Sequence, residues 1–464
     1  MNTPIHTFLT THAEKNTVRL HMPGHKGHTF LGPEPLDLTE IDGADVLYHE
    51  NGIIEQSQRN AATLFGTGRT LYSTEGSTLA IKAMLFAASR GVPTPRRRIL
   101  AARNVHKAFV FGCALLDLDV EWLFADEKTE VEPSATAHYL TARVTAAQVD
   151  AALRENASFC AVYLTSPDYL GAVSDVEGIA NVCHKYGVPL LVDNAHGAYL
   201  AFLEPSRHPI ALGADMCADS AHKTLPVLTG GAYLHVSERA PKEFASNALS
   251  GLRLFASTSP SYLVLASLDL CNAYIGDEGK EMRRRLRRAV DLAGGISTLC
   301  RELDLPLIQS DEPLKICLSL GGDDLDTFRS ILARHGVVPE MCNGEVAVFM
   351  ISTETTQEDA DALKEVLREL AAYPLKSPKV CATLKHAPPR AMSIRDAVLA
   401  PSETVSTKNA LGRVCAAPTV ACPPAVPIVI SGEVLTEEAI DALLCNGYGD
   451  IEVVKNVETG NCRG

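Results

Sequence analysis

The chain has 464 residues, of which 46% are hydrophobic and 21% are charged, as in an ordinary globular protein. A formal net charge of −14 argues against a nucleic-acid-binding protein. No apolar run approaches the roughly 20 residues of a membrane span. The 13 scattered cysteines, without a CxxC pair, favour a reducing compartment, so we expect a cytoplasmic protein. The length of the chain predicts two or three domains.

The first 275 residues divide into two parts. Residues 1–60 form a turn-rich N-terminal segment that we expect to line a cleft. From 61 to 275, predicted strands alternate with helical patterns. The strands cover 98–102, 158–165, 188–193 and 214–218, and the helices include 77–90 and 176–187. This alternation predicts a large α/β domain with a mostly parallel sheet that helices cover on both faces.

A charged helix over 276–300 leads away from this domain. Its arginine run, 283–288, is either a ligand patch or a solvated helix face, and we favour the second interpretation. A strand–helix–strand–helix pattern follows, so residues 276–376 are expected to form a linker helix and a small α+β domain. A proline-bearing connector opens the C-terminal region, 377–464, which ends in a final helix.

Lys223 lies in "DSAHKTL", between an apolar run and a glycine-rich stretch. Burying an ammonium group is costly, so its position needs a reason. It is either a lysine that reaches solvent from a strand end or a Schiff-base lysine whose site disfavours the ammonium form. Taken alone, the "HK" pair favours the first interpretation.

Asp193 ends the apolar run of "LLVDNAHGAYL". That position is the carboxyl edge of an open α/β sheet, where ligands bind. A buried carboxylate there needs a positive partner, and a protonated pyridine nitrogen, as in pyridoxal phosphate, is one. The alternative, a helix N-cap, stays equally open.

Two further stretches carry small or polar residues at predicted element ends. In "LYSTEGSTLAIKAM", Gly76, Ser77 and Thr78 open a helix, and they either bind a phosphate or simply cap the helix. Glu75 would repel a phosphate, so it must point away or pair. His106 follows a strand in "RNVHKA", where it is either a surface histidine or a residue that stacks on a flat ring.

The order of these signals resembles that of fold-type-I enzymes that use pyridoxal phosphate. More narrowly, the chain resembles the ornithine/lysine/arginine decarboxylase family in its shorter form. The matching pieces, which span nearly the whole chain, include "RLHMPGHKG" (19–27), "DLTEIDGADVLYHENGII" (37–54), "DNAHGA" (193–198), "DSAHKTLPVLTGGAYLHV" (219–236), "STSPSYLVLASLD" (257–269) and "PPAVPIVISGE" (423–433).

The resemblance implies a role for each matching position. Lys223 would carry the cofactor as a Schiff base, Asp193 would face the pyridine nitrogen, and His106 would stack on the ring. His196 would lie at the cofactor edge, where some long family members place an aromatic residue. Within the same chain, the phosphate would be held by Gly76, Ser77, Thr78, Ser220 and His222. From a partner subunit, it would be reached by Ser257 and Thr258.

The implied activity is decarboxylation of arginine, lysine or ornithine to an amine and carbon dioxide through a quinonoid, as in polyamine biosynthesis. Lys223 or His222 would return the proton to the α-carbon. The implied assembly is a homodimer with shared active sites, without nucleic acid or membrane partners.

Two other functions stay open. An aminotransferase or another fold-type-I enzyme would need an arginine for the substrate carboxylate, and Arg253 and Arg395 are candidates. A non-catalytic family member would bind pyridoxal phosphate without turnover, although the presence of Lys223 argues against it.

Specificity and metal binding are harder to read. Acidic residues are candidates for the distal substrate contact, namely Asp45, Glu50 and Glu403. A metal site at His21, His25 and His28 is disfavoured because the intervening Pro23 and Gly24 prevent a helix that would align them, so we expect no metal.

Overall fold

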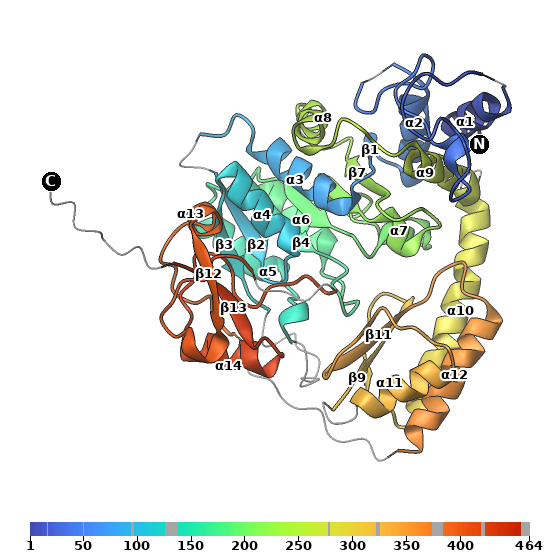
Figure 1. Cartoon of the computed structure of the whole chain (residues 1–464). Helices are drawn as coiled ribbons and strands as arrows, with labels where there is room; N and C mark the ends of the chain where they lie inside the picture. The colour runs from blue at the N-terminus through green and yellow to red at the C-terminus, as the bar shows by residue number, and fades with distance from the viewer. Residues whose placement is uncertain are drawn as a thin grey trace.

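The computed structural model describes residues 1–15, 17–49, 51–93, 97–125, 138–276, 279–321, 325–373, 384–418 and 423–455. Its centre is a seven-stranded sheet with the strand order β1-β7-β6-β5-β4-β2-β3 (Figure 1). The strands are β1 (Arg69–Ser73), β2 (Arg98–Ala102), β3 (Asp119–Leu123), β4 (Ala161–Thr165), β5 (Leu190–Asp193), β6 (Met216–Asp219) and β7 (Ala232–Val236). Strands β3, β2, β4, β5 and β6 run parallel, and β7 pairs antiparallel with both β6 and β1.

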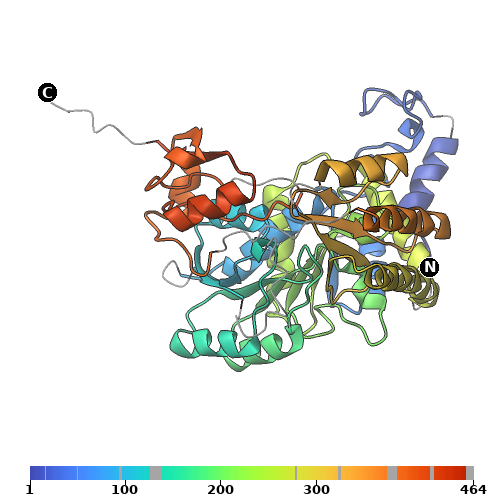
Figure 2. The same cartoon turned by 90° about the horizontal axis from the view of Figure 1, so that it is seen from below.

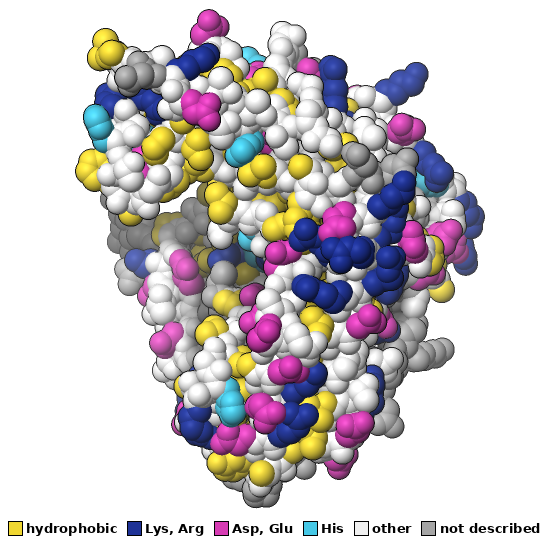
Figure 3. All heavy atoms as spheres, turned by 90° about the vertical axis from the view of Figure 1, so that its right-hand side faces the viewer, with side chains coloured by type: hydrophobic (Ala, Val, Ile, Leu, Met, Phe, Trp, Pro, Cys, Tyr) yellow, Lys and Arg dark blue, Asp and Glu magenta, His cyan; other side chains and the backbone are white. Residues whose placement is uncertain are grey.

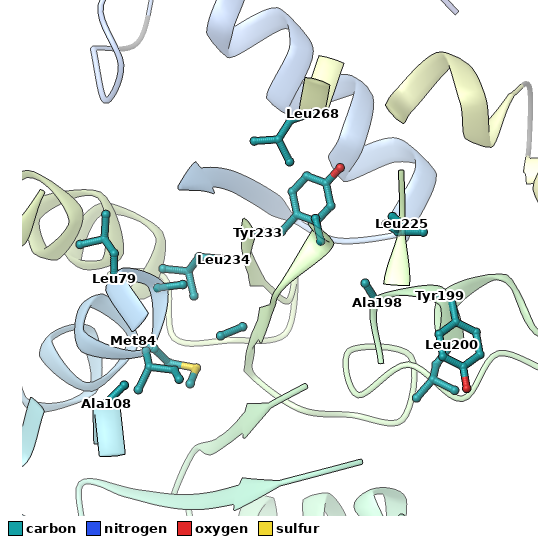
Figure 4. Packing of buried hydrophobic residues seen from close by; sticks show 14 of the residues in the cluster. Leu79, Met84, Ala108, Ala198, Tyr199, Leu200, Leu225, Tyr233, Leu234 and Leu268 are labelled. Carbon is teal, nitrogen blue, oxygen red and sulfur yellow. The ribbon is translucent and has the colours of Figure 1, made fainter. Parts of the chain in front are cut away.

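Both faces of this sheet are covered, because successive side chains of a strand point to opposite faces. Leu190 and Val192 of β5 pack with the helices α5 (Ala146–Glu155) and α6 (Val176–Lys185) on one face, whereas Leu191 belongs to the larger core on the other. Figure 2 shows α5 and α6 together below the sheet. In the close view of Figure 4, Leu79, Ala108 and Leu234 belong to that larger core. The predicted two-sided, mostly parallel sheet is present.

The helices fall into three groups along the chain. The N-terminal segment and the large sheet hold α1 (Pro4–Glu14), α2 (Ile53–Phe65), α3 (Gly76–Ser89), α4 (Lys107–Leu116), α5 (Ala146–Glu155), α6 (Val176–Lys185), α7 (Ala221–Thr224), α8 (Phe244–Phe255) and α9 (Tyr262–Ile275). The long α10 (Lys280–Glu302) follows, with α11 (Leu325–Arg334) and α12 (Gln357–Ala371). The last group is α13 (Ile394–Leu399) and α14 (Glu437–Cys445). Within the described ranges, no helix has the length and apolar character needed to cross a bilayer.

Two smaller sheets follow the large one. The first has the order β10-β11-β9-β8 and is formed by β8 (Leu307–Ile308), β9 (Lys315–Ser319), β10 (Met341–Cys342) and β11 (Val346–Met350). The second pairs β12 (Ser402–Ser406) with β13 (Asp450–Val454). In Figure 1 they lie on opposite sides below the large sheet, the first beside α10 to α12. The expected domain limits at 60, 275 and 376 stay a prediction.

The arginine run of α10 forms ion pairs along the helix surface. Arg284 and Arg285 pair with Glu281, at 2.6 and 2.9 Å, and Arg283 pairs with Glu204 at 2.9 Å. Figure 3 shows this face of the molecule, where basic and acidic side chains are interspersed. The pairing favours the solvated helix face over a ligand patch.

A buried ion pair joins the C-terminal region to the large sheet. Arg103, just after β2, donates from Nη1 and Nη2 to the two carboxylate oxygens of Glu433, at 2.6 and 2.8 Å. Both residues are less than 9% exposed. The guanidinium also lies 5.0 Å from the ring centroid of Trp122, the only tryptophan of the chain.

We expect Glu433→Ala to lower the free energy of unfolding by about 3–5 kcal/mol, because it leaves Arg103 buried without its counter-ion. Urea unfolding followed by the fluorescence of Trp122 measures this change. Glu403→Ala is the matched control, since Glu403 pairs with Arg413 but is 42% exposed, and it should cost less than about 1 kcal/mol. Equal losses in the two variants would contradict this account.

Candidate active site

A cavity of about 160 Å³ opens at the carboxyl ends of β4, β5 and β6. Parallel strands present their carboxyl ends at one edge, so residues from distant parts of the chain meet there. The lining consists of Gly76, Ser77, Thr78, Asn104, His106, Thr165, Tyr169, Asp193, Ala195, His196, Ser220, His222, Lys223, Pro424 and Val426.

Lys223 lies in α7, directly after β6, and its side chain reaches this cavity. Its Nζ is 3.1 Å from Nε2 of His196. Burial, and then the charge of Lys223, lower the pKa of His196 well below its usual value. His196 is therefore neutral at physiological pH, and its Nε2 accepts a hydrogen bond from the lysine. The amine is held inside the pocket rather than directed to solvent.

Asp193 is the last residue of β5 and is 1% exposed. Its carboxylate accepts hydrogen bonds from the backbone N–H of Ala195 (3.1 Å) and from the hydroxyl of Tyr163 (3.4 Å). Burial raises the pKa of Asp193 to about 6, although the nearby charge of Lys223 acts in the opposite direction. This carboxylate is under-solvated, and a cation in the cavity would stabilise its ionised form.

Hydroxyl groups meet where α3 and α7 begin. Ser220 donates to Oγ of Ser77 at 2.7 Å, and Thr78 lines the same wall. The N–H of Gly76 donates instead to the carbonyl of Gly230 (2.7 Å), so Gly76 shapes the turn with its positive φ of 70°. The two serine hydroxyls and the start of α3 form a cradle suited to a phosphate group.

Two other histidines of the pocket are fixed by the backbone. His106 is the N-cap of α4, where its Nδ1 accepts from the N–H of Ala108 (3.1 Å). Burial, assisted by Lys223 and Lys107, lowers the pKa of His106 to about 4, so its ring is neutral. His222 donates from Nδ1 to the carbonyl of Gly231 (3.0 Å). The imidazole that contacts Lys223 is therefore His196.

Two predicted cofactor residues lie outside the cavity of this chain. Ser257 and Thr258 are exposed, in the segment after α8. The backbone N–H of Ser257 donates to the carboxylate of Glu75 at 2.8 Å. Glu75 therefore has a hydrogen-bond partner, as expected for a carboxylate next to a phosphate site. Because these two residues were expected to serve a second subunit, their role stays a prediction.

The candidate arginines for a substrate carboxylate bind the backbone instead. Arg253 donates to the carbonyl of Tyr48, and Arg395 donates to the carbonyls of Ala114 and Leu115. Neither guanidinium lines the cavity. This arrangement weakens the aminotransferase interpretation.

The candidate specificity residues have other partners in this chain. Asp45 accepts from the N–H groups of Val46 and Ile54, and Glu403 pairs with Arg413. Glu50 lies outside the described residues. Neither Asp45 nor Glu403 lines the cavity of the same chain.

A group of buried side chains that sequence reasoning missed lies behind α7. Asp219 accepts hydrogen bonds from His208 (3.1 Å) and from Asn194 (2.8 Å), and Cys217 is 3.2 Å from the same carboxylate. Their ligand atoms are close enough for a metal ion. Each of these groups already has a hydrogen-bond partner within the network. The network therefore supports the turn that carries Lys223.

Six lining residues were not predicted: Asn104, Thr165, Tyr169, Ala195, Pro424 and Val426. Thr165 ends β4, so the rule that identified Asp193 at the end of β5 also points to it. Tyr169 packs edge-to-face on His196, with ring centroids 5.2 Å apart, and its hydroxyl donates to Glu340 at 3.0 Å.

The chain matches the model of a known protein family. The model of the Orn/Lys/Arg decarboxylase major domain matches residues 3–302. The chain belongs to this family. Membership confirms the resemblance seen in the sequence, and it identifies the protein as an amino acid decarboxylase of a family that uses pyridoxal phosphate.

Known relatives match this decarboxylase over nearly its whole length. The uncharacterized protein YaaO of Bacillus subtilis is 30% identical over 96% of this chain and 94% of its own length. An arginine decarboxylase of the same organism is 30% identical over 96% and 93%. Among solved structures, the Francisella novicida lysine decarboxylase LdcF superposes with a TM-score of 0.79 at 16% identity, covering 98% of this chain and 81% of that one. The last similarity confirms the fold-type-I class.

The cavity of the decarboxylase fits pyridoxal phosphate by its own chemistry. Asp193 is a buried carboxylate that needs a cation, and the serine hydroxyls lie at a helix start that suits a phosphate. Asn104 buries both atoms of its amide, and Thr165 its hydroxyl, without a hydrogen-bond partner among the described residues. Buried polar groups are rarely left in this state, and a ligand in the cavity would supply the missing hydrogen-bond partners.

Proposed function

We propose that this protein removes the α-carboxylate of a basic amino acid, with pyridoxal phosphate as its cofactor, and releases carbon dioxide and the corresponding amine. The observation that carries this proposal is that a lysine, Lys223, and a buried carboxylate, Asp193, line one cavity of a chain that belongs to the decarboxylase family. Arginine is the favoured substrate among arginine, lysine and ornithine, because several relatives that match this chain over nearly their full length are arginine decarboxylases.

Several residues of this cavity would take part in holding the cofactor. When bound, pyridoxal phosphate would draw electrons from the substrate α-carbon into its protonated ring. Lys223 would hold it covalently, Asp193 would keep the ring nitrogen protonated, and His106 would lie against the ring. The phosphate would be bound by Ser77, Thr78, Ser220 and His222 at the turn of Gly76, and Ser257 and Thr258 would reach it from a second copy.

Lys223 is also our candidate for returning a proton to the α-carbon. Neutral His196 orients the Nζ of Lys223 through the 3.1 Å contact. His222 is less suited to this step, since its Nδ1 proton is committed to Gly231. The contact with His196 would hold this acid inside the cavity.

We further propose a cytoplasmic homodimer with shared active sites that supplies an amine for polyamine biosynthesis. Support comes from the N-terminal segment, where five large apolar side chains are 69–91% exposed. They are Val18, Leu20, Met22, Phe30 and Leu31. Apolar exposure on this scale is typical of a subunit interface.

The proposed function is tested by incubating the purified protein with pyridoxal phosphate and each basic amino acid. We expect stoichiometric release of carbon dioxide and amine, fastest with arginine, without an added keto acid. A requirement for a keto acid would favour an aminotransferase. A yellow protein that is inert towards all three amino acids would favour a non-catalytic family member.

The pKa of Asp193 predicts a pH dependence of cofactor binding. As the pH falls through about 6, Asp193 of the cofactor-free protein becomes protonated and loses its attraction for the ring nitrogen. Binding should therefore be about tenfold weaker at pH 5 than at pH 7, as measured by absorbance titration. Because phosphate monoesters also titrate near pH 6, Asp193→Asn is the reference, and a dependence equally steep in that variant would contradict the assignment.

A further inference from the structure

The polar side chains of the cavity follow the order of the strands. Lys223 comes after β6, Asp193 ends β5, Thr165 ends β4, and Asn104 lies just beyond β2. Thr165 is the direct neighbour of Asp193 across the β4–β5 pair. The hydroxyl cradle of Ser77 and Ser220 lies on the β6 side of Asp193, so Thr165 and Asn104 lie on its other side.

Asn104 is a buried amide with no hydrogen-bond partner among the described residues. Its side chain is in the cavity wall and only 2% of the residue is exposed, yet neither Nδ2 nor Oδ1 has a hydrogen-bond partner among the described residues. The hydroxyl of Thr165 is in the same state. A buried amide without partners destabilises a protein relative to an apolar side chain of the same shape. A ligand in the cavity would complete its hydrogen bonds and offset this cost.

We propose that Asn104, supported by Thr165, binds the phenolic oxygen of the pyridoxal phosphate ring by donating a hydrogen bond from Nδ2; this rests on the proposed function. The ring carries three polar groups besides its aldehyde: the phosphate, the nitrogen and the phenolic oxygen. The phenolic oxygen and the phosphate-bearing carbon stand on opposite sides of the line from the nitrogen to the aldehyde carbon. With the nitrogen at Asp193 and the phosphate on the β6 side, the phenolic oxygen faces β4 and β2.

Asn104→Leu separates this role from a structural one, because leucine has nearly the same volume and no polar atom. We expect the cofactor-free variant to melt at the wild-type temperature or about 1–3 °C above it, since an unsatisfied amide is removed. Its affinity for pyridoxal phosphate should fall about tenfold. The pH at which the visible absorption of the bound cofactor titrates should move by about one unit, because the phenolic oxygen loses a donor.

Asn247→Leu is the matched control. Asn247 is also buried, with 9% of the residue exposed, but it accepts from Arg90 (3.2 Å), donates to the carbonyl of Ala87 (3.4 Å) and does not line the cavity. This variant should melt below the wild type and bind the cofactor normally. Thr165→Val is a second variant that tests the same role. We expect it to lower the affinity for pyridoxal phosphate and to shift the titration of the visible absorption in the same direction as Asn104→Leu, but by less. It replaces Asn104→Leu in the test if that variant does not fold.

Two results would overturn the proposal. One is a lower melting temperature with unchanged cofactor affinity and spectrum, which would make Asn104 structural. The other is an unchanged cofactor affinity with a raised KM for the amino acid, which would place Asn104 against the substrate carboxylate. Failure of the wild-type protein itself to bind pyridoxal phosphate would instead refute the proposed function, so the two failures are distinguishable.

Discussion

Replacement of Lys223 by alanine is expected to lower turnover by about 10³-fold or more, because the variant has no amine to hold the cofactor or to return a proton. The same variant should lose the visible absorption of the protein-bound cofactor. Both are measured on one sample, by amine release and by the absorption spectrum after removal of unbound pyridoxal phosphate. The fold should survive, since Lys223 is part-exposed and lies in a helix of only four residues, Ala221–Thr224.

Lys185→Ala serves as the control for the loss of a lysine elsewhere. Lys185 is 61% exposed and pairs with Asp150 on the surface, so its removal should leave both the spectrum and turnover unchanged. Decarboxylation at the wild-type rate by Lys223→Ala would overturn the assignment of the reactive lysine.

Asp193→Asn should have opposite effects on activity and on stability. Turnover is expected to fall by about 10²-fold or more, because the neutral amide no longer keeps the ring nitrogen protonated. The cofactor-free variant should nevertheless be more stable than the wild type at pH 8, by about 3 kcal/mol. Ionising the buried carboxylate costs the folded protein that amount, because its pKa is raised to about 6.

The pH dependence of this stability difference follows from the direction of the shift. Since the pKa of Asp193 in the folded protein lies above its unfolded value, the protonated form stabilises the fold at low pH, and this contribution is lost as the pH rises through about 6. The gain from Asp193→Asn should therefore be full at pH 8 and vanish near pH 4. Urea unfolding across that range measures it, with Asp361→Asn as the control at an exposed carboxylate. A variant less stable than the wild type at pH 8 would contradict the raised pKa.

Much of the large sheet could be predicted from local patterns. The predicted strand 98–102 coincides with β2, because that apolar run is buried and bounded by polar residues. The run 158–165 extends too far, since Phe159 and Cys160 are buried in the core but precede the ladder of β4. Hydrophobicity records burial, whereas strand limits depend on pairing with a neighbour, which a single sequence does not contain.

The site was predictable wherever a chemical group stands at the end of a strand or the start of a helix. Asp193, Lys223 and Ser77 were identified in this way, and Thr165 follows the same rule. Pro424 and Val426 come from a segment about 200 residues beyond Lys223 and reach the cavity only through tertiary packing. Nothing in their local sequence marks that contact. The unpartnered state of Asn104 likewise becomes visible only when the surrounding atoms are placed.

The central claim, that pyridoxal phosphate is bonded to Lys223, can be tested directly by borohydride reduction of the cofactor-loaded protein followed by peptide mass spectrometry. The reduction makes the linkage between the lysine nitrogen and the aldehyde carbon permanent, so the modified residue can be located. We expect a single modified peptide, labelled at Lys223. A label on any other lysine, or an unlabelled protein that still decarboxylates its substrate, would contradict the account.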